Sequence, residues 1–341
     1  MDFGILLGDS LSSTSPVEEL DTILRQVEAA QRAGMTYIVV GQHFLFPTAR
    51  WLQPVPLLAR LAAELDAGTR LGTHVLIAPL YHPVMLAEEL ATLDILTGGR
   101  LCAGFGLGYM RTEFEAFGIP YEERVSRFEE GIELIKRLWT EDRVTHDGPH
   151  YVLDDVTVQT RPLQTPRPTI WLGAQSVTGV RRAARLGDAW SVTALLSPDE
   201  LAERFGVFAA ERERLQLPLN RSLLRREVFV GRDREDATAI AMRMVRIWYE
   251  QMAAVGAREF DPQQVSAELL AMVEHSFVVG SAAECAAELR ALGERVPVSP
   301  IVVRANWPGI ARDEILAYIA QLGEELIPSL RDFEVTSSVA A

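Results

Sequence analysis

The chain has 341 residues, of which 48% are hydrophobic and 23% charged, so it holds ample apolar material for one large core. Its formal net charge of −14 offers no attraction to phosphate backbones, and we therefore expect no nucleic-acid partner. The two cysteines, Cys102 and Cys285, lie far apart and indicate neither a disulfide framework nor a cysteine zinc site. We see no signal peptide and no apolar run of about 18 residues, so we expect a cytoplasmic protein without a membrane span.

Strand-like and helix-like segments alternate along the whole chain. The predicted strands cover residues 2–8, 36–41, 70–78, 100–107, 168–174, 188–193, 224–231, 275–279 and 299–304. The predicted helices cover residues 16–33, 54–67, 83–96, 112–117, 121–140, 176–187, 198–215, 233–256, 282–294 and 311–329. This alternation implies parallel strands with crossover helices, and about eight such units predict an α/β fold with a single (β/α)₈ TIM barrel over residues 1–335.

Two segments depart from the alternation. Residues 143–158 place the polar turn Asp147-Gly148-Pro149 between short β-like runs, which predicts a small hairpin insertion. The tail, residues 336–341, is small and polar, and we expect it to be disordered.

Barrel enzymes place their chemistry at the C-terminal ends of the strands, which directs attention to the turn at residues 170–176. Gly173 allows close approach of a ligand to the backbone, and Ser176 is a suitable N-cap for the helix that follows. The N–H groups at that helix start can hold a phosphate. An ordinary strand-to-helix turn with a serine cap is an equally weighted alternative.

Glycines at positions 104, 106 and 108 also end a strand. Their spacing and their place after the fourth strand do not fit a Rossmann loop, so we expect no nicotinamide-binding Rossmann domain. Either these glycines clear space for a flat ring at the barrel mouth, or they allow tight strand–helix packing.

Among the histidines, His43 falls at the end of the second strand and is the candidate for catalysis. His74 interrupts the third strand, and His82 starts a helix before Pro83. No H-x-x-x-H or H-E-x-x-H spacing occurs, so the sequence encodes no helical zinc site, although a metal held by scattered acidic residues stays open.

Aromatic residues follow the ends of two strands. Phe44 and Trp51 lie in the loop after the second strand, and Tyr109 follows the glycine run. We expect them to shape a substrate pocket, with a lid packed for stability as the alternative.

Stretches spread over nearly the whole chain resemble the bacterial-luciferase-like monooxygenase family. They are 71–79, His82-Pro83, Ala87-Glu88, 93–100, 104–106, 113–118, Arg124, Arg161-Pro162, 167–173 and 183–190. The resemblance implies a barrel that binds reduced FMN or the deazaflavin F420 at its C-terminal face. It also implies a non-prolyl cis peptide in a bulge on the third strand, which by position is His74-Val75.

The same resemblance assigns site residues. The implied cofactor contacts are His74, Val75, Gly106, Ala174, Gln175, Ser176 and Gly179. His43 matches the histidine often found after the second strand, although Gly41-Gln42-His43-Phe44 stands where many members have Glu-His-His. Gly106 stands where light-emitting members have cysteine, so we do not expect bioluminescence.

The predicted function is monooxygenation of a small organic substrate by reduced FMN and O₂. No second cofactor domain is visible, so a separate flavin reductase is expected to supply the reduced flavin, and we expect a homodimer. An F420-dependent oxidoreductase that moves hydride without O₂ is the enzyme alternative, and a non-catalytic flavin-binding barrel is the other. The pocket is expected to come from the loops at 43–53, 109–120, 193–200 and 260–276.

Overall fold

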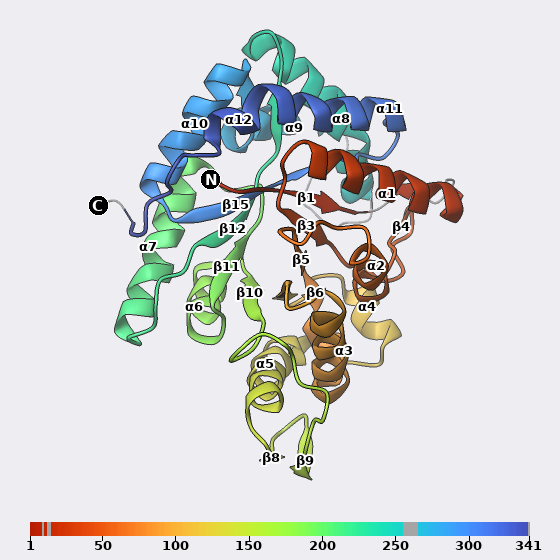
Figure 1. The fold of residues 1–341 in the computed structure, drawn as a ribbon, viewed down its shortest axis with the longest axis vertical. Coiled ribbons are helices and arrows are strands. Elements are labelled where there is room, and N and C mark those ends of the chain that lie inside the picture. The colour runs from red at the N-terminus through yellow and green to blue at the C-terminus, as the bar shows by residue number, and fades with distance from the viewer. Residues whose placement is uncertain (9, 12–14, 255–264, 340–341) are drawn as a thin grey trace.

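The computed structural model describes residues 1–8, 10–11, 15–254 and 265–339, and its central feature is a closed parallel barrel. In spatial order the barrel strands are β1 (Phe3–Leu7), β3 (Tyr37–Val40), β5 (Arg70–Thr73), β7 (Leu101–Gly106), β10 (Thr169–Gly173), β11 (Ala189–Val192), β12 (Ser222–Arg225) and β15 (Val298–Arg304). Pairing of β15 with β1 closes the ring, and every barrel pair is parallel (Figure 1). The predicted (β/α)₈ TIM barrel is confirmed.

Helices connect the strands and cover the outside of the barrel (Figure 1). They are α1 (Pro16–Arg32), α2 (Pro54–Leu61), α3 (Pro83–Leu96), α4 (Arg111–Ala116), α5 (Arg124–Thr140), α6 (Val177–Leu186), α7 (Pro198–Arg214), α8 (Arg234–Ala254), α9 (Val265–Ser276), α10 (Ala282–Arg295), α11 (Arg312–Gln321) and α12 (Ile327–Leu330). Helix α3 has the predicted bounds because its end signals are local. Pro83 begins it, and Gly98 and Gly99 follow it with φ of 66° and 79°, a conformation that glycine adopts without steric cost.

The barrel interior is filled by one side chain from nearly every strand. These inward residues are Leu6, Val39, Cys102, Trp171, Ala189, Leu223 and Val302. Since strand side chains alternate between faces, residues two positions further along each strand also point inward, toward the C-terminal end. We call this end the mouth. The residues at these positions are Gly8, Gly41, Gly104, Gly173, Arg225 and Arg304.

The predicted hairpin insertion is confirmed as the antiparallel pair β8 (Val144–Asp147) and β9 (Val152–Val156). It is fastened to α5 by Glu130, whose Oε1 accepts hydrogen bonds from His146 Nε2 at 2.8 Å and from the Tyr151 backbone N–H at 3.1 Å. A Cβ at Gly148 would lie 2.1 Å from Glu130 Oε1, so any larger residue there would displace the Glu130 and His146 side chains. The insertion is therefore a packed part of the barrel's outer layer.

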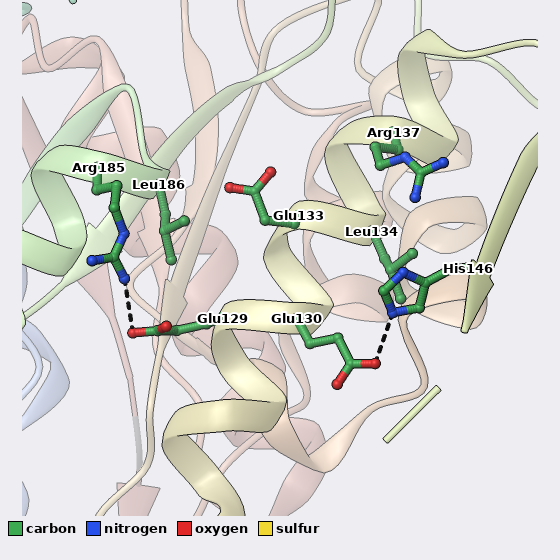
Figure 2. A pocket seen from close by; sticks show the side chains of 8 residues that line it. All are labelled: Glu129, Glu130, Glu133, Leu134, Arg137, His146, Arg185 and Leu186. Atoms are coloured by element: carbon green, nitrogen blue, oxygen red, sulfur yellow. Dashed lines mark hydrogen bonds and ion pairs between the residues drawn. The ribbon is translucent and has the colours of Figure 1, made fainter. Parts of the chain in front are cut away.

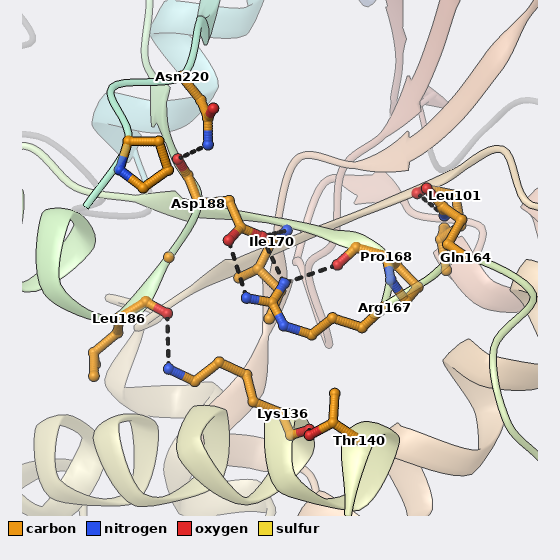
Figure 3. A network of polar contacts seen from close by, with 12 residues as sticks. Leu101, Lys136, Thr140, Gln164, Arg167, Pro168, Ile170, Leu186, Asp188 and Asn220 are labelled. Carbon is orange, nitrogen blue, oxygen red and sulfur yellow. Dashed lines mark hydrogen bonds and ion pairs between the residues drawn. The ribbon is translucent and has the colours of Figure 1, made fainter. Parts of the chain in front are cut away.

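The N-terminal ends of β10 and β11 are joined by a polar network (Figure 3). Asp188 accepts hydrogen bonds from both terminal nitrogens of Arg167, at 2.6 and 3.0 Å, and from the Ile170 backbone N–H at 2.7 Å. Lys136 on α5 donates to the Leu186 carbonyl at 3.2 Å, which ties α5 to the end of α6. This end of the barrel is consequently held by contacts within the fold.

The prediction of one strand at 224–231 is wrong. The chain bends at residues 226 and 227, so β12 ends at Arg225 inside the barrel and a new strand, β13 (Val228–Val230), starts beyond it. Strand β13 pairs in parallel with β14 (Val278–Gly280) in a separate small sheet. A continuous apolar run does not reveal such a bend, because both pieces are buried.

The prediction for residues 260–279 also needs correction. Residues 265–276 form α9 where a loop was expected, so His275 lies in the last turn of this helix, and the expected strand starts only at Val278. Residues 260–264 lie outside the described residues. The expected helix at 54–67 ends at Leu61, and the expected closing helix at 311–329 is interrupted by a π turn, Leu322–Leu326.

The third strand is interrupted, as the resemblance implied. Strand β5 ends at Thr73, the His74-Val75 peptide is cis, and a short strand β6 (Leu76–Ile77) resumes the pairing with β7. Gly72 pairs with Cys102 and Leu76 with Phe105, so four residue steps on this strand oppose three on β7. That one extra residue is a β-bulge at the barrel mouth.

At the C-terminus, the Thr336 backbone N–H donates to the Gly293 carbonyl at 2.9 Å, and Val339 packs against the core. Residues 340–341 of the expected disordered tail lie outside the described residues. Within the described ranges, no helix has both the length and the apolar character needed to cross a membrane.

Candidate active site

The mouth brings several of the sequence-predicted residues into contact. His43 follows β3 and lies against the rings of Trp51 and Tyr109, with ring centroids 5.0 and 5.3 Å away. Phe44 points elsewhere: its ring packs on Phe117 at 4.8 Å, so it belongs to an outer aromatic cluster. The predicted substrate-pocket residues thus divide into two that touch His43 and one that does not.

Both ring nitrogens of His43 have partners. Nδ1 lies 3.1 Å from Glu113 Oε1, and Nε2 lies 3.2 Å from the Tyr109 hydroxyl. The side chain is 13% exposed, so solvent reaches only part of the ring. The backbone carbonyl of His43 accepts a hydrogen bond from Gln53 Nε2 at 3.1 Å, which fixes the loop that carries the ring.

Glu113, on the short helix α4, is a site residue that sequence reasoning missed. It is fully buried, and its Oε1 also accepts the Phe44 backbone N–H at 2.7 Å. The sequence places it 70 residues from His43, and nothing local relates the two. The one local feature that could have drawn attention to Glu113 is its place next to the apolar Phe114, which is buried on the same short helix.

Gln42 explains why this chain departs from the Glu-His-His pattern. Its Oε1 accepts the Ile77 backbone N–H at 2.9 Å, while its Nε2 donates to Gln53 Oε1 at 2.9 Å and to the Tyr81 hydroxyl at 2.5 Å. Gln42 thereby connects the end of β3 to the resumed third strand β6. The Gln42 amide therefore has a structural role, since both its oxygen and its nitrogen form hydrogen bonds with groups of the protein.

His74 lies at the bulge and contacts Ser191 of β11, with Nδ1 2.7 Å from the hydroxyl oxygen. Burial, and secondarily the charge of Arg225, lowers the pKa of His74 to about 3. The imidazole is therefore neutral at physiological pH and provides a polar but uncharged surface. Neither Ser191 nor Arg225 was predicted as a site residue, because the barrel closure alone brings them to His74.

Val75 covers the centre of the mouth. A Cβ at Gly106 would lie 2.5 Å from Val75 Cγ2, and a Cβ at Gly173 would meet Val75 Cγ1 at 3.5 Å. A Cβ at Gly104 would lie 1.8 Å from the Thr73 carbonyl oxygen. Gly104 and Gly106 therefore make room for the bulge of the neighbouring strand, a strand–strand contact rather than the expected strand–helix packing, and the Val75 side chain stays partly exposed at the mouth.

The turn after β10 has the geometry of an anion site. Ser176 caps α6, its hydroxyl accepting the Gly179 N–H at 3.1 Å, and Trp190 Nε1 fixes the turn by donating to the Ala174 carbonyl at 3.0 Å. Arg204 of α7 donates to the Gln175 carbonyl, which brings a guanidinium group to the same turn. The first N–H groups of a helix lack intrahelical partners and attract anions.

One wall of the mouth is a column of stacked groups. The Arg304 guanidinium lies 4.0 Å from the Trp248 ring centroid and 4.4 Å from that of Trp307, and Phe46 stacks on Trp248 at 5.9 Å. Trp51 meets Phe46 and Trp248 edge-on at 6.4 and 6.2 Å. The loop after β3, helix α8 and the end of β15 are thus joined through aromatic contacts.

Other parts of the molecule offer less chemistry. A surface hollow of about 490 Å³ lies between α5, α6 and the hairpin (Figure 2). Its charged groups are in ion pairs: Arg185 with Glu129 at 3.0 Å and His146 with Glu130 at 2.8 Å inside the hollow, and Glu133 and Arg137 with neighbours on α5 and just beyond it. The hollow lies at the opposite end of α6 from Ser176, so we interpret it as a packing interface between α5, α6 and the hairpin and not as part of the candidate site.

Metal and thiol chemistry have little support in the described part of the chain. No group of three or more His, Cys, Asp or Glu side chains there is arranged to hold a metal ion. Cys102 and Cys285 are both free and buried, and burial raises the pKa of each thiol to about 12. Buried thiols of this kind are inert as nucleophiles.

Comparison with known proteins gives relatives of two cofactor types. The chain is 31% identical to the oxygenase component of a flavin-dependent trigonelline monooxygenase from Acinetobacter baylyi, over 69% of this chain and 65% of that protein. It is 34% identical to an F420-dependent glucose-6-phosphate dehydrogenase from Beutenbergia cavernae, over 50% of this chain and 52% of that protein. The matches span about half to two thirds of these relatives' lengths.

Solved structures share the fold over almost the whole chain. The monooxygenase RslO1 from Streptomyces bottropensis superposes with a TM-score of 0.81 at 23% identity, covering 96% of this chain and 99% of that one. The model of the luciferase-like monooxygenase family matches residues 1–298. This protein therefore belongs to the luciferase-like monooxygenase family.

Proposed function

We propose that the protein is a flavin-dependent monooxygenase that oxidises a small organic substrate with reduced FMN and O₂. The observation that carries the proposal is the joint arrangement of three features at one mouth. These are the Val75 surface over Gly106, the capped start of α6 at Ser176, and His43 with its buried partner. The match to the oxygenase component of a flavin-dependent trigonelline monooxygenase supports the same choice.

The residues present fit a phosphorylated flavin. A flat ring could rest on the partly exposed Val75 side chain, beside Gly173, which has no side chain to occupy that space. The phosphate would be held by the free N–H groups behind Ser176, with the Arg204 guanidinium nearby. Neutral His74 would face the ring without adding a charge.

The bound flavin would supply the oxidising chemistry, while the protein supplies position and protons. Trp51, Phe46 and Trp248 form an apolar wall that keeps water from the reacting region. His43, partly exposed between Trp51 and Tyr109, would exchange a hydrogen bond or a proton with the substrate at Nε2.

An F420-dependent oxidoreductase is the second candidate. The observation in its favour is the 34% identity to an F420-dependent dehydrogenase over half of this chain. The same mouth could accept a deazaflavin ring, so the two candidates differ in cofactor and in the need for O₂. The separate reductase, the homodimer and the cytoplasmic location remain predictions from the sequence.

A coupled assay with labelled oxygen tests the proposal. Purified protein is combined with a flavin reductase, NADH, FMN and ¹⁸O₂, and a panel of small organic substrates is screened by mass spectrometry. The expected result is a product that gains one ¹⁸O atom only when the protein is present. Substrate oxidation that proceeds without O₂ when F420 replaces FMN would reject the monooxygenase and select the second candidate.

A further inference from the structure

We propose that Glu113 is a positioning residue that holds the His43 proton on Nδ1, so that Nε2 faces the mouth as a hydrogen-bond acceptor. The inference builds on the proposed function and specifies it further. If Nε2 accepts, the substrate group that meets it must be a donor. The geometry therefore points to a substrate that carries an O–H or N–H group next to the site of oxidation.

The first step concerns Glu113 Oε1, which has two neighbours. The Phe44 backbone N–H can only donate, so at 2.7 Å it makes Oε1 the acceptor of a hydrogen bond. An Oε1 atom that accepts this bond presents a lone pair to His43 Nδ1, 3.1 Å away. Nδ1 must then carry hydrogen, because two lone pairs at that distance would repel.

The second step is that the arrangement is fixed. Glu113 is fully buried, and the His43 ring is flanked by the Trp51 and Tyr109 rings at T-shaped angles of 71° and 78°. The Gln53 amide holds the His43 carbonyl. Exchanging the two ring nitrogens would require moving several packed groups, so Nδ1 stays against Glu113, and the acceptor there selects the tautomer.

The third step concerns Tyr109. Its hydroxyl lies 3.2 Å from His43 Nε2, where a phenol O–H can donate to a bare nitrogen. Tyr109 is 47% exposed, so its hydroxyl lies where a ligand can reach the mouth from solvent. We infer that this hydroxyl marks the position of the substrate donor.

A proton transfer in this geometry balances without a further reactant. The O–H or N–H bond of the substrate breaks, its proton bonds to His43 Nε2, and the electron pair stays on the substrate oxygen or nitrogen. His43 then carries a positive charge beside the buried Glu113 carboxylate, which offsets it. Glu113 acts only through His43, whereas His43 contacts the substrate.

The tautomer can be measured directly on the cofactor-free protein. Two-bond ¹H–¹⁵N correlation spectra of protein with ¹⁵N-labelled histidine distinguish Nδ1–H from Nε2–H rings, and His43→Gln assigns the signal among the six histidines. The expected pattern for His43 is Nδ1–H. An Nε2–H pattern would overturn the inference, whereas absence of flavin turnover would overturn the proposed function and leave this result intact.

Two variants and one control sharpen the test. Glu113→Gln retains an acceptor oxygen but no charge, so the tautomer should persist while kcat falls about tenfold or more and KM changes little. Glu113→Ala should give mixed tautomers, and if it does not fold, the wild-type spectrum still decides. Glu115→Gln, a change at an exposed glutamate of the same helix, should match the wild type. An unaltered His43 spectrum in folded Glu113→Ala would contradict the positioning role.

The substrate class is tested by blocking the donor. For any substrate that the protein oxidises, the analogue methylated at its O–H or N–H group should lose about tenfold or more in kcat/KM, the effect of one lost buried hydrogen bond. The Tyr109→Phe variant, which has no competing hydroxyl, should show the same discrimination. Equal kcat/KM for the parent and methylated compounds would overturn the inferred substrate class.

Discussion

The two ends of this barrel are built from similar polar residues but use them differently. At the N-terminal end, Asp188 is surrounded by donors from Arg167 and Ile170, and its hydrogen bonds stay within the fold. At the mouth, His43 is fixed on one side by Glu113, and its other nitrogen meets only the half-exposed Tyr109. The polar contacts at the N-terminal end therefore stabilise the fold, whereas those at the mouth position His43 and leave one of its nitrogens accessible to a ligand.

The largest expected effect is at His43. Replacement by alanine should lower kcat by roughly 10²–10⁴-fold, the usual range for a lost acid–base group, with a Tm close to that of the wild type. Steady-state rates and thermal melts measure the two quantities. As the matched control, His146→Ala at the hairpin should lower Tm slightly and leave kcat unchanged, since His146 contacts only the structural Glu130. The reverse pattern in these two variants would contradict the division between the ends.

Asp188 should give the next largest effect. Its removal by Asp188→Ala leaves the Arg167 guanidinium and the Ile170 N–H without their acceptor, which should cost about 2–4 kcal/mol of the free energy of unfolding. Denaturant unfolding measures this loss, and kcat per folded molecule should remain that of the wild type. A stable variant with reduced kcat would mean that the N-terminal end shapes the site after all.

Ser176→Ala should have a smaller, ligand-specific effect. Loss of the cap should cost about 1 kcal/mol in stability, and FMN affinity should fall by about tenfold while riboflavin affinity is unaffected. Ser281, which caps α10 away from the mouth, provides the control. Ser281→Ala should show a similar stability loss with no change in FMN affinity, and an equal loss of FMN affinity in both variants would remove the phosphate assignment.

The smallest effect concerns acid stability. The folded-state pKa of His74, about 3, lies below the unfolded value of about 6.5, so the unfolded chain binds the proton first as pH falls. This difference removes stability as pH falls from about 6.5 toward 3. A His74→Asn variant should therefore lose less Tm between pH 7 and pH 5 than the wild type does. Identical acid sensitivity of the two proteins would show that His74 is not held neutral.

Much of the fold was predictable because its signals are local. The bounds of α3 follow from Pro83 and from Gly98-Gly99, and the hairpin follows from its Asp-Gly-Pro turn. The bend after Arg225 was not predictable from periodicity, because the pieces on both sides of it are buried and apolar. Helix α9 was missed although Leu269, Val273 and Ser276, its buried residues, follow a helical spacing.

The site was predictable only at its strand ends. His43 and Ser176 stand beside recognisable strand boundaries, so their positions at the mouth could be inferred. Glu113 is the partner of His43 across 70 residues, and Ser191 is the partner of His74 across 117 residues. No sequence spacing encodes such contacts. The chemistry of the site depends on these distant partners, because they set the tautomer and the charge of each ring.

The central claim, that the mouth binds reduced FMN for oxygen chemistry, is tested most directly by comparing cofactor affinities. Anaerobic titrations of the same protein with reduced FMN, reduced F420 and reduced riboflavin give three dissociation constants. Reduced FMN should bind at least about tenfold more tightly than reduced riboflavin, because the Ser176 turn holds its phosphate, and it should also bind more tightly than reduced F420 if the protein is a monooxygenase. Tighter binding of F420, or equal binding of riboflavin and FMN, would contradict the central claim.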